Sequence, residues 1–240
     1  MLIDLHAHSS GISPCCCIAV PEVLREAKRV GLDGIVLTNH YQKSSVKNGD
    51  AVDFARRYLE EYHTAVRLGE RIGCKTLFGI EVTAERYHLV HLLIYGVDED
   101  FVLEHPTMFD YTLEELYRLV KARGGCLVQA HPFRRVDSLM DVKWMDGIEI
   151  SCHPKYESTH LEKIAKIATR WGKILTCGGD YHADTPYRPR CGMYLPDEVR
   201  DTYDLARFLL SAPSVELCVH EIGQEAPHRV TFARGEGITQ

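Results

Sequence analysis

Short runs of apolar residues alternate along the chain with longer stretches in which apolar and polar residues are mixed. The short runs have the length and composition of buried strands, whereas the longer stretches space their apolar residues as on one face of a helix. This alternation is typical of strands joined by crossover helices, and it predicts an α/β fold with the strands parallel in one sheet. The runs expected to be strands are 2–6, 34–38, 76–80, 89–95, 126–130, 147–151, 173–176 and 215–219.

Turn and cap residues mark where several helices should begin and end. Proline at the start and glycine at the end bound a helix over about 21–31. Thr112 and Glu115 have the spacing of a capping box, which predicts that a helix starts there. We expect one domain over residues 1–222, followed by a polar and loosely held tail over residues 223–240.

Composition narrows the class of protein. The chain has 240 residues, of which 45% are hydrophobic, and this suffices for a sizeable core. No apolar run approaches the roughly 18 residues that span a membrane. The N-terminus shows no basic segment followed by an apolar one, so we expect no secretory signal and a cytoplasmic location. The nine cysteines are then not expected to form a disulfide framework.

The charge pattern argues against one class of partner. The formal net charge is -6, and lysine and arginine are spread along the chain rather than clustered. We therefore expect no extended basic surface for nucleic acid. The chain also contains 13 histidines, which points instead to imidazoles gathered around cations.

Residues that can bind a metal fall at the ends of the expected strands. Asp4, His6 and His8 alternate in the first strand, so their side chains share one face. Other strands run into His40, Glu81, His131, His153, Asp180 and His182. The carboxyl ends of parallel strands meet on one surface, so these side chains should be neighbours. Imidazole and carboxylate are metal ligands, and Asp4 would accept the remaining ring N–H of one of them.

Together these motifs resemble the polymerase and histidinol phosphatase (PHP) superfamily of metal-dependent phosphoesterases. The resemblance rests on DLHAH at 4–8, GLDG at 31–34, TNH at 38–40, GIE at 79–81, His91, AHP at 130–132 and GDYH at 179–182, which occur in family order. It implies a distorted seven-stranded (β/α)7 barrel, similar to a TIM barrel, over residues 1–222. Up to three divalent metal ions would lie at the carboxyl ends of its strands.

The resemblance also implies a ligand set for each ion. One ion would be held by His6, His8, Glu81 and Asp180, and a second by Glu81, His91 and His131, so that Glu81 bridges the two. The third would be held by His40, His182 and a residue of the loop after the first strand.

This loop departs from the family because residues 9–20 contain neither an acidic residue nor a histidine. We expect Cys15 or Cys16 to replace the missing ligand, since a thiolate binds zinc well and keeps the negative charge. Two alternatives stay open for the Cys15–Cys17 triplet. One is burial without chemistry, and the other is a strained disulfide or a response to oxidants.

Catalytic roles are expected for Glu81, Asp180, His153 and Arg134. Two ions bridged by Glu81 would share a water and lower its pKa, giving a hydroxide aligned for in-line attack on phosphorus. Arginine forks match phosphate geometry, and Arg134 is chosen from a group that also contains Arg135, Arg188 and Arg190. His153 is a candidate ligand, substrate contact or general acid, with a structural role as the alternative.

The sequence thus predicts a hydrolase that cleaves a small phosphate monoester or a nucleotide-type phosphoester. It would use two or three divalent ions of zinc, iron or manganese, and its partner would be the small substrate rather than a membrane. One alternative is an amidohydrolase-like enzyme that cleaves C–N bonds, although no strand-borne lysine fits the carboxylated lysine of that family. The other is a non-catalytic metal or redox sensor built on the Cys15–Cys17 loop.

Overall fold

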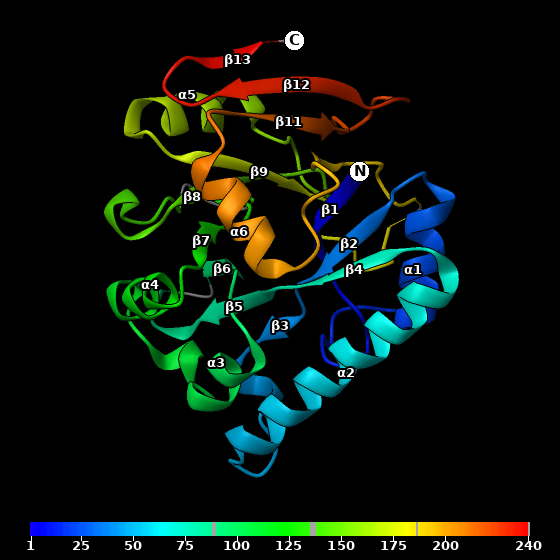
Figure 1. Cartoon of the computed structure of the whole chain (residues 1–240), viewed down its shortest axis with the longest axis vertical. Helices are drawn as coiled ribbons and strands as arrows, with labels where there is room; N and C mark the ends of the chain where they lie inside the picture. Colours follow the sequence, from blue (N-terminus) through cyan, green and yellow to red (C-terminus); the bar gives the residue numbers. More distant parts are fainter. Residues whose placement is uncertain (88–89, 135–137, 186, 240) are drawn as a thin grey trace.

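The structure, a computed structural model, describes residues 1–87, 90–134, 138–185 and 187–239. Its strands form two sheets, and helices flank both of them (Figure 1). Strands and helices alternate over most of the chain. The mixed α/β fold expected from the sequence is therefore confirmed.

The first sheet combines the first strand of the chain with the C-terminal strands. Its order is β13-β12-β11-β10-β1-β2-β4. The strands are β1 (Leu2–Ala7), β2 (Gly34–Leu37), β4 (Lys75–Phe78), β10 (Gly192–Tyr194), β11 (Ser214–Val219), β12 (His228–Ala233) and β13 (Gly237–Thr239). β1, β2 and β4 run parallel, whereas β10 to β13 extend the sheet from β1 in antiparallel pairs.

The second sheet has the order β3-β5-β6-β7-β8-β9. Its strands are β3 (His40–Tyr41), β5 (Ile80–Ala84), β6 (Val90–Tyr95), β7 (Cys126–Gln129), β8 (Gly147–Ser151) and β9 (Ile174–Gly178). β3 pairs parallel with β5, and β7, β8 and β9 are also parallel. β6 is antiparallel to both of its neighbours.

The single parallel sheet expected from the sequence is wrong, and the pairing of the described residues does not confirm a closed (β/α)7 barrel. β6 shows one physical reason. The connection from β5 to β6 spans only residues 85–89, which is too short for a crossover helix, so the two strands pair antiparallel. The first residue of the strand expected over 89–95 lies outside the described residues.

The two sheets meet at two places. Ala7 at the end of β1 bridges to Tyr181 just after β9, and the backbone N–H of Asp180 donates to the carbonyl of His6 at 2.9 Å. Elsewhere only Gly79 separates β4 of the first sheet from β5 of the second. A Cβ atom at Gly79 would lie 2.6 Å from a side-chain atom of Val36, so this close approach requires glycine. The ends of strands from both sheets therefore lie close together on one side of the fold.

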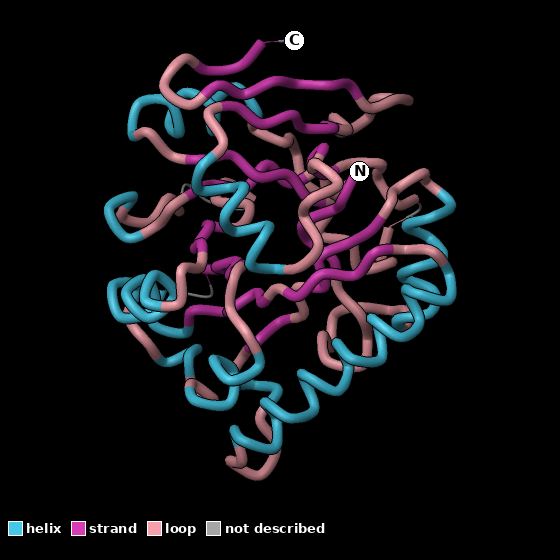
Figure 2. The backbone as a smooth tube through the Cα atoms, in the orientation of Figure 1, coloured by secondary structure: helices cyan, strands magenta, loops and turns pink. Residues whose placement is uncertain are grey.

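Six α-helices and four short 3-10 helices are found in the described ranges. They are α1 (Val20–Arg29), α2 (Ala51–Ile72), α3 (Glu99–Glu104), α4 (Leu113–Ala122), α5 (Leu161–Trp171) and α6 (Thr202–Ser211), with η1 (Lys43–Ser45), η2 (Glu85–Tyr87), η3 (Met108–Asp110) and η4 (Val142–Trp144). α1 and α2 lie along the side of the molecule next to β2 and β4 (Figures 1 and 2). α4 begins with the capping box predicted at Thr112 and Glu115.

The C-terminal segment is held by the first sheet. We expected residues 223–240 to form a loosely held tail, but β12 pairs with β11 along its length and β13 pairs with β12. Val230 and Phe232 of β12 are buried in the core, whereas Arg229 before them is exposed and Thr231 between them is less buried. This period-two alternation is the pattern of a sheet with one face on the core, and it accounts for the difference.

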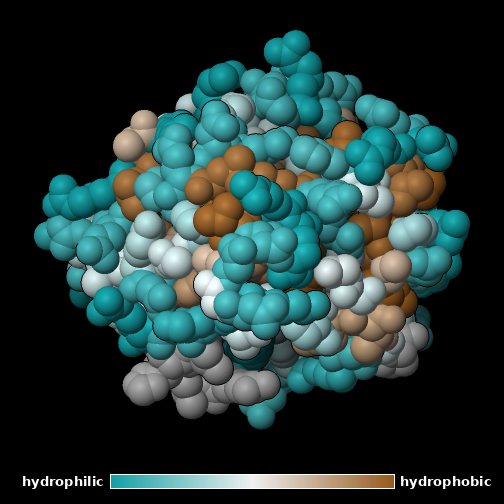
Figure 3. All heavy atoms as spheres, turned by 90° about the horizontal axis from the view of Figure 1, so that it is seen from below, coloured by the Kyte–Doolittle hydropathy of each residue, from teal (hydrophilic) through white to brown (hydrophobic). Residues whose placement is uncertain are grey.

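The face of the molecule shown in Figure 3 is largely hydrophilic, and the hydrophobic patches on it are separated by hydrophilic residues. The large apolar residues that are exposed belong to different parts of the chain, namely Val52, Leu103, Trp171, Tyr187 and Tyr203. Of the helices in the described ranges, none has both the length and the apolar character needed to cross a lipid bilayer.

Candidate metal centre

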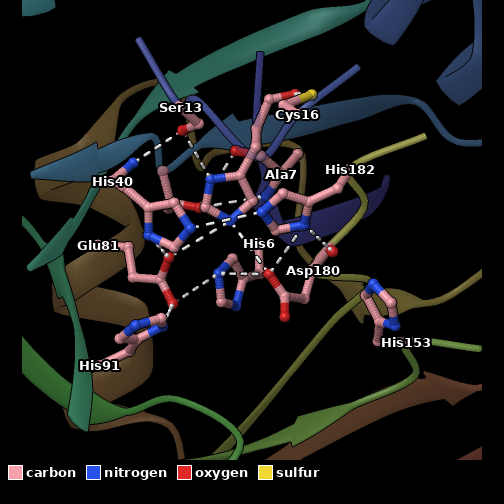
Figure 4. Close-up of polar contacts among 12 residues, drawn as sticks. His6, Ala7, Ser13, Cys16, His40, Glu81, His91, His153, Asp180 and His182 are labelled. Atoms are coloured by element: carbon pink, nitrogen blue, oxygen red, sulfur yellow. Dashed lines mark hydrogen bonds and ion pairs between the residues drawn. The ribbon is translucent and has the colours of Figure 1, made fainter. Parts of the chain in front are cut away.

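Eight side chains with metal-binding groups meet where the strand ends of the two sheets converge. They are His6 in β1 and His8 just after it, His40 in β3, Glu81 in β5, His91 in β6, His131 after β7, and Asp180 and His182 after β9. All eight residues are buried, with no more than 8% of any of them exposed. Figure 4 shows the side chains of six of them pointing toward one another, namely His6, His40, Glu81, His91, Asp180 and His182. The structure therefore brings together every histidine and carboxylate that the sequence analysis assigned as a ligand.

The Glu81 carboxylate lies at the centre of the cluster. Its Oε2 atom is 2.6 Å from His40 Nδ1, and its Oε1 atom is 2.9 Å from His91 Nδ1. The Nε2 atoms of His6 and His131 each lie 3.2 Å from Oε1. One carboxylate is thus shared by imidazoles from four separate parts of the chain, as a bridging ligand would be.

Asp180 supplies the second carboxylate. Its Oδ1 atom is 3.1 Å from His8 Nε2 and 3.4 Å from His6 Nε2, and its Oδ2 atom accepts a hydrogen bond from the Tyr156 hydroxyl. Asp180 and His131 have positive φ angles of 48° and 28°, which residues with side chains rarely adopt. Such conformations persist where the surroundings fix them, and they often occur at functional sites.

Several polar atoms of the cluster have no hydrogen-bond partner. These buried atoms are His6 Nε2, His40 Nδ1, His91 Nδ1 and Glu81 Oε2. Each imidazole nitrogen lies within 3.2 Å of a Glu81 oxygen, yet the geometry does not make a hydrogen bond. Buried polar groups without partners are costly and uncommon. The convergence of these lone pairs fits divalent cations, which would accept electron density from them.

Among the residues that the structure describes, four sets of ligand atoms are compact enough to surround an ion. They are His6–Glu81–His131–Asp180, His40–Glu81–His91, His8–His40–His182 and His153–Asp180–His182. Glu81 belongs to two sets, as the expected bridging role requires. The grouping differs in detail from the one implied by the family resemblance, because His131 lies with His6, and His8 lies with the third set.

The charge states of Glu81, Asp180 and His131 suit metal binding. Burial raises the pKa of Glu81, but the neighbouring imidazoles, His91 foremost, lower it more, so that its pKa lies well below the ordinary value. Burial likewise opposes ionisation of Asp180, and His6 and other imidazoles again bring its pKa well below the ordinary value. Burial lowers the pKa of His131 to about 4. Ionised carboxylates and neutral imidazole are the forms that bind metals.

Glu149 in β8, which the sequence analysis missed, fixes two of the cluster residues. Its Oε1 atom is 2.8 Å from His6 Nδ1, and its Oε2 atom accepts a hydrogen bond from the backbone N–H of His131 at 3.1 Å. An imidazole held at Nδ1 presents Nε2 to an ion. Burial raises the pKa of Glu149 to about 7, although His6 opposes this effect. The available sequence signal is an acidic residue within the apolar run Gly147–Ser151.

Asp4 supports the same region, but not in the expected way. The ring N–H contact expected of Asp4 is made by Glu149 instead. Asp4 accepts hydrogen bonds from the backbone N–H groups of His6 at 3.1 Å and Gly179 at 2.8 Å, and it pairs with Arg188 at 2.7 Å. The Arg188 side chain is fully buried in this pair, so it does not face the substrate side of the cluster.

A cavity of about 470 Å³ opens onto the cluster. Its lining combines His40, His91, Asp180 and His182 with Cys15, Arg134, His153, Lys155, Tyr156 and Asp184. A cavity of this size accommodates a small molecule.

Arg134 and Tyr156 form one wall of the cavity. The Arg134 guanidinium lies 5.8 Å from the centre of the Tyr156 ring, and its Nη1 atom is 3.4 Å from the Tyr156 hydroxyl oxygen. Arg134, which we expected to bind phosphate, therefore lines the cavity. Arg190 is exposed and donates its backbone N–H to His220, and Arg135 lies outside the described residues.

His153 lines the cavity beside this wall. Its ring stacks on Tyr156 with 4.6 Å between ring centres, and its Nδ1 atom accepts a hydrogen bond from the backbone N–H of Lys155 at 3.1 Å. The other ring nitrogen, Nε2, is 3.5 Å from Asp184 Oδ1. Because Nδ1 is an acceptor, the proton of the neutral ring sits on Nε2.

The three consecutive cysteines have different surroundings. Cys15 is exposed and lines the cavity, and Cys17 is also exposed. Cys16 is buried, and its Sγ atom faces the backbone carbonyls of His8 at 3.4 Å and Ile18 at 3.5 Å. Burial raises the pKa of Cys16 to about 11. Of the two replacement ligands expected from the sequence, Cys15 faces the cavity and Cys16 faces the backbone.

No family model and no curated protein matches the sequence, but solved structures match its fold. A structure described as a metal-dependent phosphoesterase from Bifidobacterium adolescentis is 18% identical, with a TM-score of 0.54 over 87% of this chain and 95% of that chain. A two-domain protein from Bacteroides vulgatus, containing a predicted PHP-like metal-dependent phosphoesterase, is 14% identical, with a TM-score of 0.60 over 100% of this chain and 88% of that chain.

An amidohydrolase from Chromobacterium violaceum, solved with bound sulfate and no metal, also matches. It is 18% identical, with a TM-score of 0.57 over 86% of this chain and 96% of that chain. Identities this low show a shared fold rather than a shared activity. The chain therefore shares its fold with these structures, one of which contains a predicted PHP-like phosphoesterase.

Proposed function

We propose that the chain is a metal-dependent phosphoesterase that hydrolyses a small phosphate monoester or a nucleotide-type phosphoester. The observation that carries the proposal is the Glu81 carboxylate shared by four imidazoles next to a cavity lined by an arginine. Such a buried set of polar groups is costly unless it holds cations. The fold of the compared phosphoesterase structures supports the same class of enzyme.

The cluster would hold two or three divalent ions. Glu81 and Asp180 would supply the anionic ligands, and the imidazoles would come from His6, His8, His40, His91, His131 and His182. Zinc, iron and manganese all accept nitrogen and oxygen ligands of this kind. When bound, such ions lower the pKa of a water molecule and stabilise negative charge on phosphoryl oxygens.

Arg134 would bind and orient the substrate. Its planar guanidinium at the cavity wall matches two oxygens of a phosphoryl group. The Tyr156 hydroxyl accepts a hydrogen bond from Arg134 and donates one to Asp180. Tyr156 therefore links the wall that would hold the phosphoryl group to the carboxylate that would hold an ion.

His153 would donate a hydrogen bond to the oxygen of the leaving group. Its Nε2 atom carries the ring proton, because Nδ1 accepts the backbone N–H of Lys155. The Asp184 carboxylate 3.5 Å away helps to hold this ring at the edge of the cavity. A hydrogen bond to the departing oxygen stabilises the charge that develops as the P–O bond breaks.

The test is hydrolysis of a panel of phosphate monoesters by protein of known metal content. Glu81→Gln removes the shared negative charge while keeping the side-chain size. Activity should fall by more than about 100-fold, the upper range for losing a group that only supports a ligand, and bound metal should fall with it. Glu162→Gln, at an exposed position of α5, is the matched control and should retain both. Unchanged activity and metal content in Glu81→Gln would contradict the proposal.

An amidohydrolase-like C–N hydrolase is the second candidate, because a structure of the same fold is an amidohydrolase. The panel should therefore include amides beside the phosphate esters. Turnover of an amide and of no ester would favour this alternative. A metal-loaded protein that is inert toward both would favour the sensor that the Cys15–Cys17 loop suggests.

A further inference from the structure

The loop between β1 and α1 brings one ionisable side chain to the cavity. Residues 9–20 contain neither an acidic residue nor a histidine, although this loop would be expected to complete the site of a third ion. Cys15 is the residue of this loop that lines the cavity. Its two cysteine neighbours differ from it, because Cys16 is buried against backbone carbonyls and Cys17 does not belong to the cavity lining.

Hydrogen bonds on both sides of Cys15 tie the loop to two histidines. The Ser13 hydroxyl accepts a hydrogen bond from the backbone N–H of His40 at 2.9 Å. The backbone N–H of Cys17 donates to the carbonyl of His182 at 2.8 Å. Cys15 therefore lies between Ser13, which is bound to His40, and Cys17, which is bound to His182.

The imidazoles next to Cys15 form a ligand set without a carboxylate, and its members are His8, His40 and His182. The Nε2 atoms of His40 and His182 are 3.4 Å apart, and the His8 ring stacks on both at 4.5 and 4.2 Å between ring centres. His182 Nδ1 donates to the carbonyl of Asp180 at 2.7 Å, which leaves the lone pair on Nε2. His40 is almost fully buried, and its Nδ1 atom faces Glu81, so Nε2 is the ring nitrogen that faces His182. Of the four ligand sets, this one contains no carboxylate.

We propose that the Cys15 thiolate is the anionic ligand of the cation that this set of imidazoles holds, and that it makes the position select zinc over manganese. The inference rests on the proposed function for the presence of metal, but it concerns this one position. A thiolate is a soft ligand that suits zinc, whereas manganese prefers oxygen ligands. On binding, the S–H bond breaks, the proton passes to solvent and a sulfur–metal bond forms.

Cobalt(II) tests this proposal, because a thiolate ligand gives cobalt an intense sulfur-to-metal charge-transfer absorption in the near ultraviolet. The wild type titrated with cobalt should show this band, and Cys15→Ser should lose it. Cys17→Ser, at the exposed neighbouring cysteine, is the matched control and should keep it. Cys15→Asp supplies an oxygen anion in place of sulfur, so it should bind as many cobalt ions as the wild type without the band.

The outcomes separate this inference from the proposed function. Cobalt bound to the wild type without the band, or a band that survives in Cys15→Ser, would overturn the inference while a phosphoesterase with nitrogen and oxygen ligands still stands. A wild type that binds no cobalt at any position would overturn both.

Alkylation gives a second readout that needs neither cobalt nor substrate. Cys15 and Cys17 are both exposed, so iodoacetamide should label both in metal-free protein, as mass spectrometry of peptides would show. Zinc should prevent the labelling of Cys15 and leave that of Cys17 unchanged, whereas manganese at the same concentration should protect Cys15 less. Equal labelling of Cys15 with and without zinc would contradict the inference.

Discussion

Two regions of the candidate site are built in different ways. The floor is the buried ligand set His6, Glu81, His131 and Asp180, of which Asp180 lines the cavity, and the wall consists of the cavity residues Arg134, His153, Lys155 and Tyr156. Floor residues lie on strands or directly after them, and buried groups such as Glu149 and Asp4 hold them from outside the cluster. Wall residues lie on the loops after β7 and β8, and only His153 among them is buried.

The difference indicates that the floor determines metal binding and the wall determines substrate binding. A floor fixed by strands and by buried hydrogen-bond partners suits the constant geometry that metal ions demand. A wall carried by loops can change with the substrate while the scaffold stays the same. Changes behind the floor should therefore reduce stability and metal binding, whereas changes at Arg134 and Lys155 in the wall should alter substrate affinity and leave metal binding unchanged.

The largest effect should come from removing the support behind the floor. Arg188→Met leaves the Asp4 carboxylate buried without the partner that lies 2.7 Å away. The free energy of unfolding, measured with denaturant, should fall by about 3–5 kcal/mol. Arg190→Met changes an exposed arginine two residues away and should alter it by less than about 0.5 kcal/mol. Equal stability of the two variants would show that the floor does not depend on this pair.

A smaller effect is expected when the group that orients a ligand loses its charge. Glu149→Gln keeps the shape of the side chain but weakens its contact with His6 Nδ1 at 2.8 Å. Metal affinity, measured by competition with a chelator, should fall about 10- to 100-fold. Glu162→Gln is again the matched control. Unchanged affinity in Glu149→Gln would mean that the fold alone orients His6.

In the wall, Arg134→Lys should change substrate binding and leave the floor intact. Lysine keeps the charge but loses the planar fork, which costs roughly one hydrogen bond of about 1 kcal/mol, or about fivefold in KM. Metal content should match that of the wild type. A loss of metal in this variant would break the distinction between wall and floor.

The smallest effect should come from the most exposed member of the wall. Lys155 Nζ is 2.6 Å from Asp184 Oδ2, but the lysine side chain is 55% exposed, so solvent screens the pair. Lys155→Ala should change KM by only about twofold, equivalent to about 0.5 kcal/mol, and the difference should shrink with added salt. A large increase in KM that resists salt would instead identify Lys155 as a direct ligand of the substrate.

Most of the floor residues could be identified from the sequence because they follow strand signals. His6 and His8 share a face through the period of two, and His131 and Asp180 follow apolar runs. The carboxyl ends of such strands meet, and the structure does bring these residues together. Glu149 could not be identified in the same way, because its role depends on the distance between β8 and β1, which local pattern does not encode.

The pairing of the strands and the paths of the loops also could not be predicted from the sequence pattern. The pairing of β10 to β13 with β1 is set by long-range contacts, and the short β5–β6 connection reverses a strand that the overall alternation predicted to be parallel. Cys15 and Cys16 are adjacent in the same loop, yet one faces the cavity and the other faces the backbone. Such a choice depends on how the loop is anchored, which the sequence pattern alone does not specify.

Anomalous diffraction from crystals soaked in zinc tests the central claim most directly. The account predicts anomalous peaks within the cluster, with at least one about 2.0–2.2 Å from an oxygen of Glu81. The absence of any peak there, while zinc binds elsewhere on the protein, would contradict it.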